Sequence, residues 1–486
     1  MPDIAPFRGI RYDAERVPIE KVVTPPYDVI SPAERRHFHA VHPMNVIRLI
    51  LGEEFPDDNS TNNRYTRAGK YWRAWREEGI LQTESRPCYY VYRQQFTVNG
   101  KLFTRCGFLA RLRLVPFETG IVQAHEETHS APKEELFALL RATAANFSPV
   151  WALYHDGEGR ARRCLEQTME RVAPLYRFVD EAGVTQELWA LPAGTEAALG
   201  LEQVLAGQPV VIADGHHRYE SRLRYQAERR AAELARRSDR AGSPEVNSGA
   251  DLEKAGWNYT LTYFLALEDP GLVILPTHRL VHLPALKGGD ARAGTRSGSI
   301  LELLGPVTSP FTVTSLRPGA GGAVGAAVEA ALGALEAAPA GRPAFALVGS
   351  TGEAYLFVLN DDEAMRRAAP EHGDVWRRLD VAVLHRLFLD PLLAASVGDA
   401  GRDTSEQAQV VAGNIEYTQQ VGRVKEALEA GGSGGGADLA VLLRPTRAWE
   451  VAAVAGRGEK MPPKSTFFHP KLLTGLVMDD LEIPTG

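Results

Sequence analysis

Cysteine is scarce in this sequence, and long apolar runs are missing. Among 486 residues there are only three cysteines, Cys88, Cys106 and Cys164, and none forms a CxxC pair. This usage argues against a disulfide framework or a structural zinc site and fits a reducing compartment, so we expect a cytoplasmic protein. No apolar stretch approaches the ~20 residues of a membrane span, and prolines and charges stand where a signal peptide needs an apolar core. We therefore expect no membrane anchor.

An excess of positive charge is also absent. Lys and Arg number 54 against 61 Asp and Glu, which gives a formal net charge of −7. Nucleic acid is therefore not the expected partner, because nothing neutralises its phosphates overall. The arginines between Arg222 and Arg240 alternate with acidic residues, and this pattern predicts a solvated helix face. The oligomeric state is left open by these features.

Apolar residues, in contrast, are plentiful at 44%, enough for a large core and roughly two or three domains. Strand-like runs such as CYYVYRQQFTV and YTLTYFLAL alternate with amphipathic stretches, which predicts a mixed α/β (α+β) fold. We expect an N-terminal α/β region over 1–285, a Gly/Ala-rich linker with a peripheral helix over 286–342, and a C-terminal α/β region over 343–486. The last region holds the segment MPPKST and a hairpin predicted from PAFALVGS and AYLFVLN.

The stretch VVIADGHHRYES predicts a strand that turns at Gly215 into a helix. Such a turn lets the backbone approach a ligand, and the first helix amides with the helix dipole favour an anion, phosphate above all. His216, His217 and Arg218 add hydrogen-bond donors and a planar cation. Asp214 suits a proton acceptor or a ligand of a divalent cation. An equally open alternative is that Asp214 only caps the helix while the other side chains are solvated.

A second segment, IVQAHEETHSAPKEELF, matches the HExxH zinc-protease pattern by letter, beginning at His125. That pattern needs a continuous helix, but Ser130 followed by a proline predicts a helix start, so the two histidines should precede the helix and share no face of it. We expect no metal site here. The same loop gathers Glu126, Thr128 and Lys133, which suits a substrate or a nucleotide, with an ordinary polar loop as the alternative.

Two proline-rich segments near the ends of the chain supply further candidates. In TPPYDVISPAE the fixed backbone of the prolines holds Tyr27 and Asp28 in one orientation, which suits a binding site or a plain turn. The letters SPAE in the same segment predict a helix capping box. In MPPKSTFFHPK the side chains of Lys464, Ser465, Thr466, His469 and Lys471 suit an anion, although the glycines of a Walker loop are absent.

Taken together, several segments resemble one family. TPPYDVI, HEET with a downstream PK, NFSPVWALY, ADGHHRYE, PTHRL, RPT and MPPKSTFFHPKLLTGL occur in the order and spacing of the bacterial and archaeal domain-of-unknown-function family 1015. More remotely, ADGHHR is similar to the Asp-Gly-His-x-Arg signature of the free serine kinases of the ParB and sulfiredoxin superfamily. That resemblance implies a ParB/sulfiredoxin-like turn in which residues 214–218 meet nucleotide phosphates and Asp214 helps to activate a serine hydroxyl.

Three functional classes fit these features. The first is a small-molecule kinase that moves phosphate from ATP or ADP, with Mg²⁺, to a hydroxyl such as that of free L-serine. The alternatives are a nucleotide-binding regulatory protein without turnover and a metal-dependent hydrolase. For the kinase we expect Asp214 and Glu126 as the catalytic carboxylates. Glu126 is preferred over Asp28 as the second one, because it directly precedes a helix start beside His125, Thr128 and Lys133.

Overall fold

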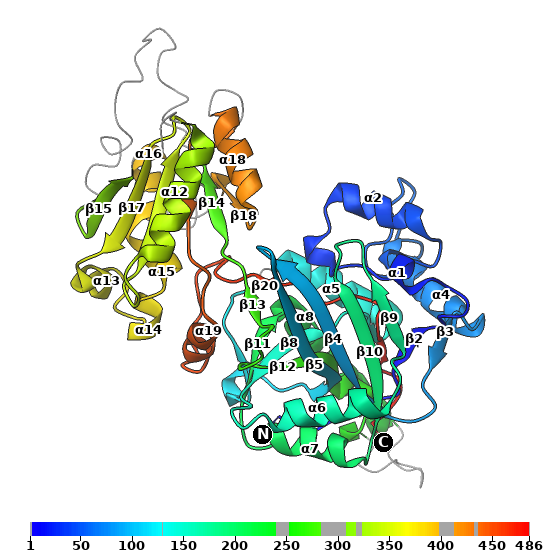
Figure 1. Cartoon of the computed structure of the whole chain (residues 1–486). Helices are drawn as coiled ribbons and strands as arrows, with labels where there is room; N and C mark the ends of the chain where they lie inside the picture. The colour runs from blue at the N-terminus through cyan, green and yellow to red at the C-terminus, as the bar shows by residue number, and fades with distance from the viewer. Residues whose placement is uncertain are drawn as a thin grey trace. The chain divides into compact units, whose positions relative to one another are not determined.

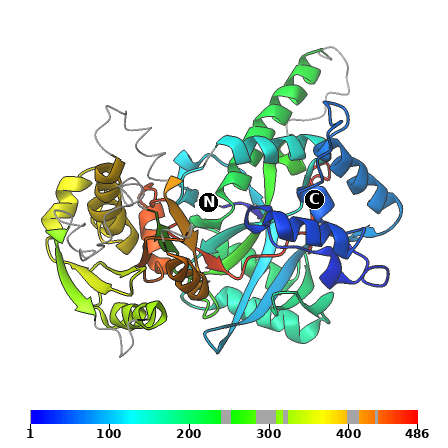
Figure 2. The same ribbon diagram turned by 90° about the horizontal axis from the view of Figure 1, so that it is seen from above.

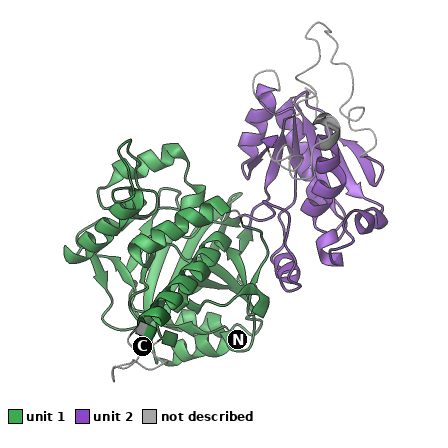
Figure 3. Cartoon of the chain, turned by 180° about the vertical axis from the view of Figure 1, so that it is seen from behind, with its two compact units in different colours: residues 1–273, 468–486 green, residues 274–467 purple. Residues whose placement is uncertain are grey.

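The computed structural model divides into two compact units. Its described residues are 2–128, 130–239, 252–282, 308–316, 323–397, 413–431 and 436–485. Unit 1 comprises residues 1–273 and 468–486, and unit 2 comprises residues 274–467, as Figure 3 shows. The sequence predicted breaks near 285 and 342, but the first break falls at 273 and the tail after 467 returns to unit 1. Much of the expected linker lies outside the described residues.

A mixed sheet forms the centre of unit 1. Its strands follow the order β6, β11, β8, β12, β5, β4, β10, β9, and β1 pairs with β5. β6 and β11 run parallel, as do β8 and β12, and the other pairs are antiparallel. Their bounds are β1 Ile4–Ala5, β4 Cys88–Val98, β5 Lys101–Arg113, β6 Val122–Ala124, β8 Val150–Tyr154, β9 Tyr176–Val179, β10 Thr185–Pro192, β11 Val210–Asp214 and β12 Tyr259–Ala266. The two runs predicted as strands, in β4 and β12, are therefore confirmed, and so is the mixed α/β class.

Helices cover both faces of this sheet. α6 (Arg160–Arg171) and α7 (Glu196–Leu205) pack side by side on one face, in front of the strands in Figure 1. α8 (His216–Asp239) lies in front of the strands when unit 1 is seen from behind in Figure 3, and its second half extends beyond them in Figure 2. Side chains alternate between the two faces along each strand. Tyr89 and Val91 of β4 belong to the core under α6 and α7, whereas Tyr90 and Tyr92 point to the other face.

Two buried arginines fix the last residues of the chain across that other face. Arg105 donates to the carbonyl oxygens of His469, at 3.0 Å, and Pro470, at 2.7 Å. Arg111 donates to Asp479 Oδ1, at 2.8 Å, and to the carbonyls of Asp480 and Ile483. Buried guanidinium groups require such partners. The last residues of the chain are therefore part of the core of unit 1, which explains why they belong to unit 1 although unit 2 directly precedes them in the sequence.

The remaining elements of unit 1 are short, apart from α2, α4 and α5. They are β2 Ile10–Tyr12, α1 Ile19–Val22, η1 Tyr27–Val29, α2 Pro32–Val41, α3 Ile47–Ile50, α4 Arg64–Glu77, β3 Leu81–Thr83, η2 Phe117–Thr119, α5 Ser130–Thr143, β7 Ala145–Asn146, η3 Gly256–Asn258, β13 Val273–Ile274 at the boundary, β20 Phe468–His469 and β21 Asp479–Asp480. The predicted capping box is present at the start of α2, where Ser31 and Glu34 bond each other's backbone N–H.

Unit 2 is built on an antiparallel sheet in the order β15, β17, β16, β19, β14, β18. Its strands are β14 His278–Val281, β15 Phe311–Leu316, β16 Ala344–Gly349, β17 Ala354–Leu359, β18 Ile415–Thr418 and β19 Leu439–Leu442. Its helices are α12 Val324–Ala337, α13 Asp362–Ala368, α14 Asp374–Arg377, α15 Asp380–Leu384, the π-helix η5 His385–Leu389, α16 Asp390–Val397, α18 Val421–Ala430 and α19 Ala448–Ala455. β16 and β17 confirm the predicted hairpin, and α12 is the helix expected in the Ala-rich stretch.

Candidate functional site

The junction between β11 and α8 forms as the sequence predicted. β11 ends at Asp214, α8 begins at His216, and Gly215 between them has φ of 96°. A side chain there would be strained, and an added Cβ would also lie 2.9 Å from Nε of Arg218. Glycine therefore allows Arg218 to fold back over the turn toward the carboxylate of Asp214.

Asp214 lies between two cations. Its Oδ2 accepts a hydrogen bond from Arg218, and its Oδ1 accepts one from Nζ of Lys471 at 2.5 Å. All three side chains are largely buried, with exposed fractions of 16% for Asp214, 5% for Arg218 and 14% for Lys471. Burial opposes ionisation of the carboxyl, but the charges of Lys471 and Arg218 outweigh it and hold the pKa of Asp214 well below its usual range. The carboxylate of Asp214 therefore stays ionised at neutral pH and is a weak base.

Arg222, one turn further along α8, adds a third cation. It is 5% exposed, and it donates to Asn146 Oδ1 and to the carbonyl of Ser148, the latter at 3.0 Å. Burial, followed by the charge of Arg218, lowers the pKa of Arg222 to about 9, so the side chain is still a cation at neutral pH. The prediction of a solvated face beginning at Arg222 was therefore wrong for this residue, because α8 is amphipathic and its first turns pack against β8.

Glu126 lies beside two buried histidines. Its carboxylate is 3.7 Å from Nε2 of His125 and 3.6 Å from Nδ1 of His216, while its side chain stays 32% exposed. The two imidazole rings meet edge to face at 4.8 Å, and Nδ1 of His125 lies 2.8 Å from the carbonyl oxygen of Ile212. This arrangement joins the loop after β6 to the start of α8, and leaves one partly exposed carboxylate beside the turn.

Thr128 of this loop and Lys133 in the first turn of α5 both bind one acid of α8. Glu220 accepts hydrogen bonds from the hydroxyl of Thr128, at 2.6 Å, and from Nζ of Lys133, at 2.8 Å. Burial alone would raise the pKa of Glu220, but these two bonds lower it. Both predicted substrate contacts therefore have a partner within the protein. His217, next to the cluster, is half-buried.

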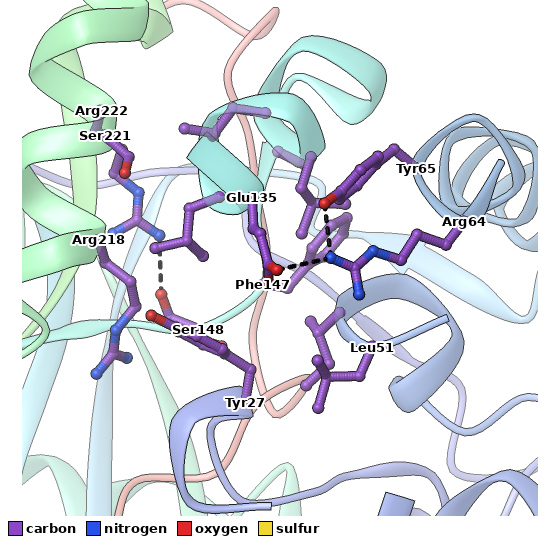
Figure 4. Close-up of a pocket in the computed structure, with 15 residues that line it drawn as sticks. Tyr27, Leu51, Arg64, Tyr65, Glu135, Phe147, Ser148, Arg218, Ser221 and Arg222 are labelled. Carbon is purple, nitrogen blue, oxygen red and sulfur yellow. Dashed lines mark hydrogen bonds and ion pairs between the residues drawn. The ribbon is translucent and has the colours of Figure 1, made fainter. Parts of the chain in front are cut away.

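A pocket of about 620 Å³, its mouth included, opens beside the arginines of α8. Figure 4 shows Arg218, Ser221 and Arg222 on one side of it, Ser148 and Tyr27 below them, and Arg64 with Tyr65 and Glu135 on the other side. Its apolar wall consists of Ile50, Leu51, Leu136, Leu139, Leu140, Ala145 and Phe147. Small-molecule sites have this volume, an apolar wall and a few polar groups at one end.

Tyr27 comes from η1, whose entry is set by the two prolines as predicted. Burial, followed by the charge of Asp28, raises the pKa of the Tyr27 hydroxyl well above its usual value, so it stays a neutral donor. Asp28 itself is exposed. The structure thus places Tyr27 in the pocket wall, whereas Asp28 does not line that pocket.

The C-terminal motif is split between the two units. Lys464, Ser465 and Thr466 belong to unit 2, whereas Lys471 belongs to unit 1 and reaches Asp214. The sequence indicated Lys471 only as one of the residues of this motif that suit an anion, and it did not predict the contact with Asp214. Arg222 was not selected, although its spacing of four residues after Arg218 could have indicated it.

The HExxH letters do not lie on one helix. α5 begins at Ser130, so His125 precedes it, and the second histidine of the pattern, His129, is outside the described residues. Over the part of the chain that the structure describes, no group of three or more His, Cys, Asp or Glu side chains is arranged to hold a metal ion. The same residues include no helix that is long and apolar enough to cross a membrane.

Solved structures to which the chain is similar include a conserved hypothetical protein from Pyrococcus furiosus, with 13% identity, a TM-score of 0.31, and coverage of 75% of this chain and 93% of that one. A free serine kinase in complex with AMP has 13% identity and a TM-score of 0.30, covering 74% and 86%. SbnI with a C-terminal truncation from Staphylococcus aureus has 12% identity and a TM-score of 0.29, covering 78% and 87%. No curated protein matches the sequence.

One family matches the chain over most of its length. Its description is "Protein of unknown function (DUF1015)", and the match extends from residue 4 to residue 382. It thus includes β11, the glycine turn and the first turns of α8, together with the loop that carries Glu126. On this match the chain belongs to the DUF1015 family.

Proposed function

We propose that unit 1 binds the phosphates of a nucleotide at the start of α8 and transfers a phosphoryl group to a small hydroxyl compound. The observation that carries the proposal is the row of cations at the N-terminus of α8: Arg218 and Lys471 both contact Asp214, and Arg222 lies one turn beyond Arg218. Asp214 offsets only part of this charge. An anion of more than one charge would complete it, and helix N-termini and arginine forks are the groups that bind phosphate in proteins.

The pocket beside Arg218 and Arg222 supports a nucleotide rather than free phosphate. Its cationic end adjoins the turn, and the rest of its lining is mainly aliphatic and aromatic, with Tyr65 and Phe147, apart from the ion pair of Arg64 with Glu135. A nucleoside phosphate has the complementary features, a ring that suits the apolar wall and a charged end that suits the arginines. The likeness of ADGHHR to the signature of the free serine kinases points to the same ligand, and makes free L-serine the best candidate acceptor.

For the chemical step, the acceptor oxygen attacks phosphorus, the bond from phosphorus to the leaving phosphate oxygen breaks, and the hydroxyl proton needs an acceptor. Asp214 holds Arg218 and Lys471 in place and is a weak base because its pKa is lowered. We assign the proton to Glu126, which is partly exposed and beside His125 and His216. Arg218, Arg222 and Lys471 stabilise the charge on the transferred group.

Mg²⁺ is proposed to enter with the nucleotide. In phosphoryl transfer this ion is usually held by phosphate oxygens and one or two carboxylates, and it neutralises charge on the transferred group. Asp214 is the carboxylate at the phosphate turn that could contribute to holding the ion, and it would share its oxygens with Arg218 and Lys471. His217, Thr128, Lys133 and Tyr27 remain proposed contacts for the acceptor or the nucleotide.

The test incubates the full chain with ATP or ADP, Mg²⁺ and a panel of hydroxy amino acids, and follows new phosphomonoesters by phosphorus NMR. The expected result is a new ester signal that is lost in Arg218→Ala and kept in Arg224→Ala, a matched change of an exposed arginine on α8. Nucleotide binding without any ester would refute the kinase.

That outcome would favour a regulatory protein that binds nucleotide without turnover. One observation favours this second candidate: Asp214, the acid within the signature, is engaged by two cations and has a lowered pKa. A site used only for binding needs no base, so Glu126→Gln would then leave every measurable property of nucleotide binding unchanged.

A further inference from the structure

Unit 2 contains a pocket that the proposed function does not use. It has a volume of about 810 Å³, its mouth included. Its walls come from β14, the segment after β19, the start of α15 and the start of α19. Five arginines line it against two carboxylates: Arg279, Arg342, Arg378, Arg444 and Arg447, with Asp380 and Glu450. Arg279 comes from the segment PTHRL and Arg444 from RPT, two segments to which unit 1 gives no role.

Arg279 is a buried cation without a carboxylate partner among the described residues. It is 1% exposed. Its guanidinium donates to the carbonyls of Thr277, Pro463 and Lys464, lies 5.3 Å from the ring of Tyr417, and has no partner for Nε. Burial lowers the pKa of Arg279 to about 10, which leaves it charged at neutral pH. An uncompensated buried charge is costly, and a neighbouring anion would offset it.

The carboxylates of the pocket do not supply that anion. Asp380 is used by Arg444, which donates to both of its oxygens at 2.7 Å. Glu450 accepts from the backbone N–H of Arg447 at 2.8 Å, and burial raises its pKa. Arg378 and Arg447 are exposed and form no ion pair within 4.0 Å among the residues that the structure describes. Arg279, Arg378 and Arg447 therefore form no ion pair within 4.0 Å with either carboxylate of the pocket.

An aromatic group stands at the same pocket. Trp449, in the first turn of α19, lines the pocket and is 55% exposed, the largest exposed aromatic side chain in the described part of the chain. An exposed indole beside a cluster of arginines offers a planar apolar surface to a ring that carries a negative charge. The first amides of α19 add to the positive potential at this end.

We propose that this pocket is a second ligand site, specific to unit 2, for a small phosphate monoester that carries an aromatic ring. The phosphate would lie between Arg378 and Arg447, above the buried charge of Arg279, and the ring would stack on Trp449. A dianion is favoured over a single carboxylate because the five arginines of the pocket outnumber its two carboxylates, one of which is already paired with Arg444. The site is independent of the phosphate turn in unit 1.

The experiment titrates the full chain with phenyl phosphate, inorganic phosphate and benzoate by calorimetry at low ionic strength. Phenyl phosphate should bind tightest, and Arg378→Ala/Arg447→Ala should weaken it at least tenfold. The matched control is Arg366→Ala/Arg367→Ala, which removes the same charge from exposed positions of α13 and should leave binding unchanged. Trp449→Ala should abolish the preference for phenyl phosphate over inorganic phosphate, whereas Trp449→Phe should keep it.

Three results would overturn the proposal. They are binding of phenyl phosphate that the double arginine change does not weaken, benzoate binding as tightly as phenyl phosphate, and a ring preference that survives Trp449→Ala. The variant Arg218→Ala distinguishes the two sites, because phenyl phosphate should still bind to unit 2 when the turn in unit 1 is altered. Loss of phenyl phosphate binding in Arg218→Ala, with circular dichroism unchanged, would place the ligand in unit 1 and refute the second site.

Discussion

Replacing Asp214 by Asn should destabilise unit 1 strongly, because the change leaves Arg218 and Lys471 buried without their shared counter-charge. Removing one partner of a buried ion pair typically costs about 3–5 kcal/mol. The residual exposure of Asp214 and Lys471, 16% and 14%, and the amide oxygen that Asn retains, place the expected loss near the lower limit. A loss of about 3 kcal/mol corresponds to roughly hundredfold faster amide exchange where opening is global.

Hydrogen exchange of peptides from β11 and α8 measures this loss within unit 1, which a single unfolding transition of a chain with two units does not. The matched control is Glu228→Gln on the same helix, whose exposed pair with Arg141 should contribute less than about 1 kcal/mol. Adding Lys471→Met to Asp214→Asn should restore part of the loss, since one of the two uncompensated cations disappears. Equal protection in Asp214→Asn and Glu228→Gln would refute the reasoning.

The pH dependence of the same contribution has a definite sign. The pKa of Asp214 is lowered in the folded chain, so its stabilisation is fully present above the ordinary carboxyl pKa of about 3.9 and declines as the pH falls below it. The difference in the free energy of opening of β11 and α8, measured by hydrogen exchange, between the unchanged chain and Asp214→Asn should therefore be constant from pH 8 to about 5 and narrow below about 4. A difference that vanished near neutral pH would contradict the assigned ionisation.

The remaining predictions concern ligands. Arg218→Ala should weaken nucleotide binding by about 1.5–3 kcal/mol in a calorimetric titration, the usual scale of a charge-assisted hydrogen bond, while Arg224→Ala should change it little. Glu126→Gln should lower phosphoester formation roughly a hundredfold at unchanged nucleotide affinity, and an equal loss of both would show that Glu126 only supports the loop. Purified protein should hold no stoichiometric zinc by elemental analysis, since α5 begins after His125; one zinc per chain that is lost in His125→Ala would disprove this.

Local features of the site could be predicted from the sequence, and distant ones could not. The turn at Gly215 follows from local sequence alone, because a glycine stands between an apolar run and a helical pattern. The capping box at Ser31 likewise depends on residues only three positions apart. Lys471, by contrast, meets Asp214 across 257 positions, and nothing in its neighbourhood indicates which acid it contacts. Burial of Arg222 likewise follows from how α8 packs, which an alternation of charges does not reveal.

The domain boundaries could not be predicted from the sequence for a related reason. Composition marks the Gly/Ala-rich stretch, but the first break falls at 273, before it, between residues of ordinary composition. The C-terminal segment packs on unit 1 because it binds Arg105 and Arg111, which lie more than 360 residues away in the sequence. Strands such as β4 and β12 were predictable because their apolar runs are long and local.

The insertion of unit 2 within the sequence of unit 1 sets an order of assembly during synthesis. Asp214 and Arg218 leave the ribosome first, and Lys471 follows 257 residues after Asp214. At roughly 5–20 residues per second this delay is on the order of 10–50 s, long enough for an inserted unit to fold first. Throughout that time the acid lacks one of its two cations, and Arg105 and Arg111 lack the tail that they bind. The cluster of Asp214, Arg218 and Lys471 is therefore completed last, and a chain that stops within unit 2 is made without it.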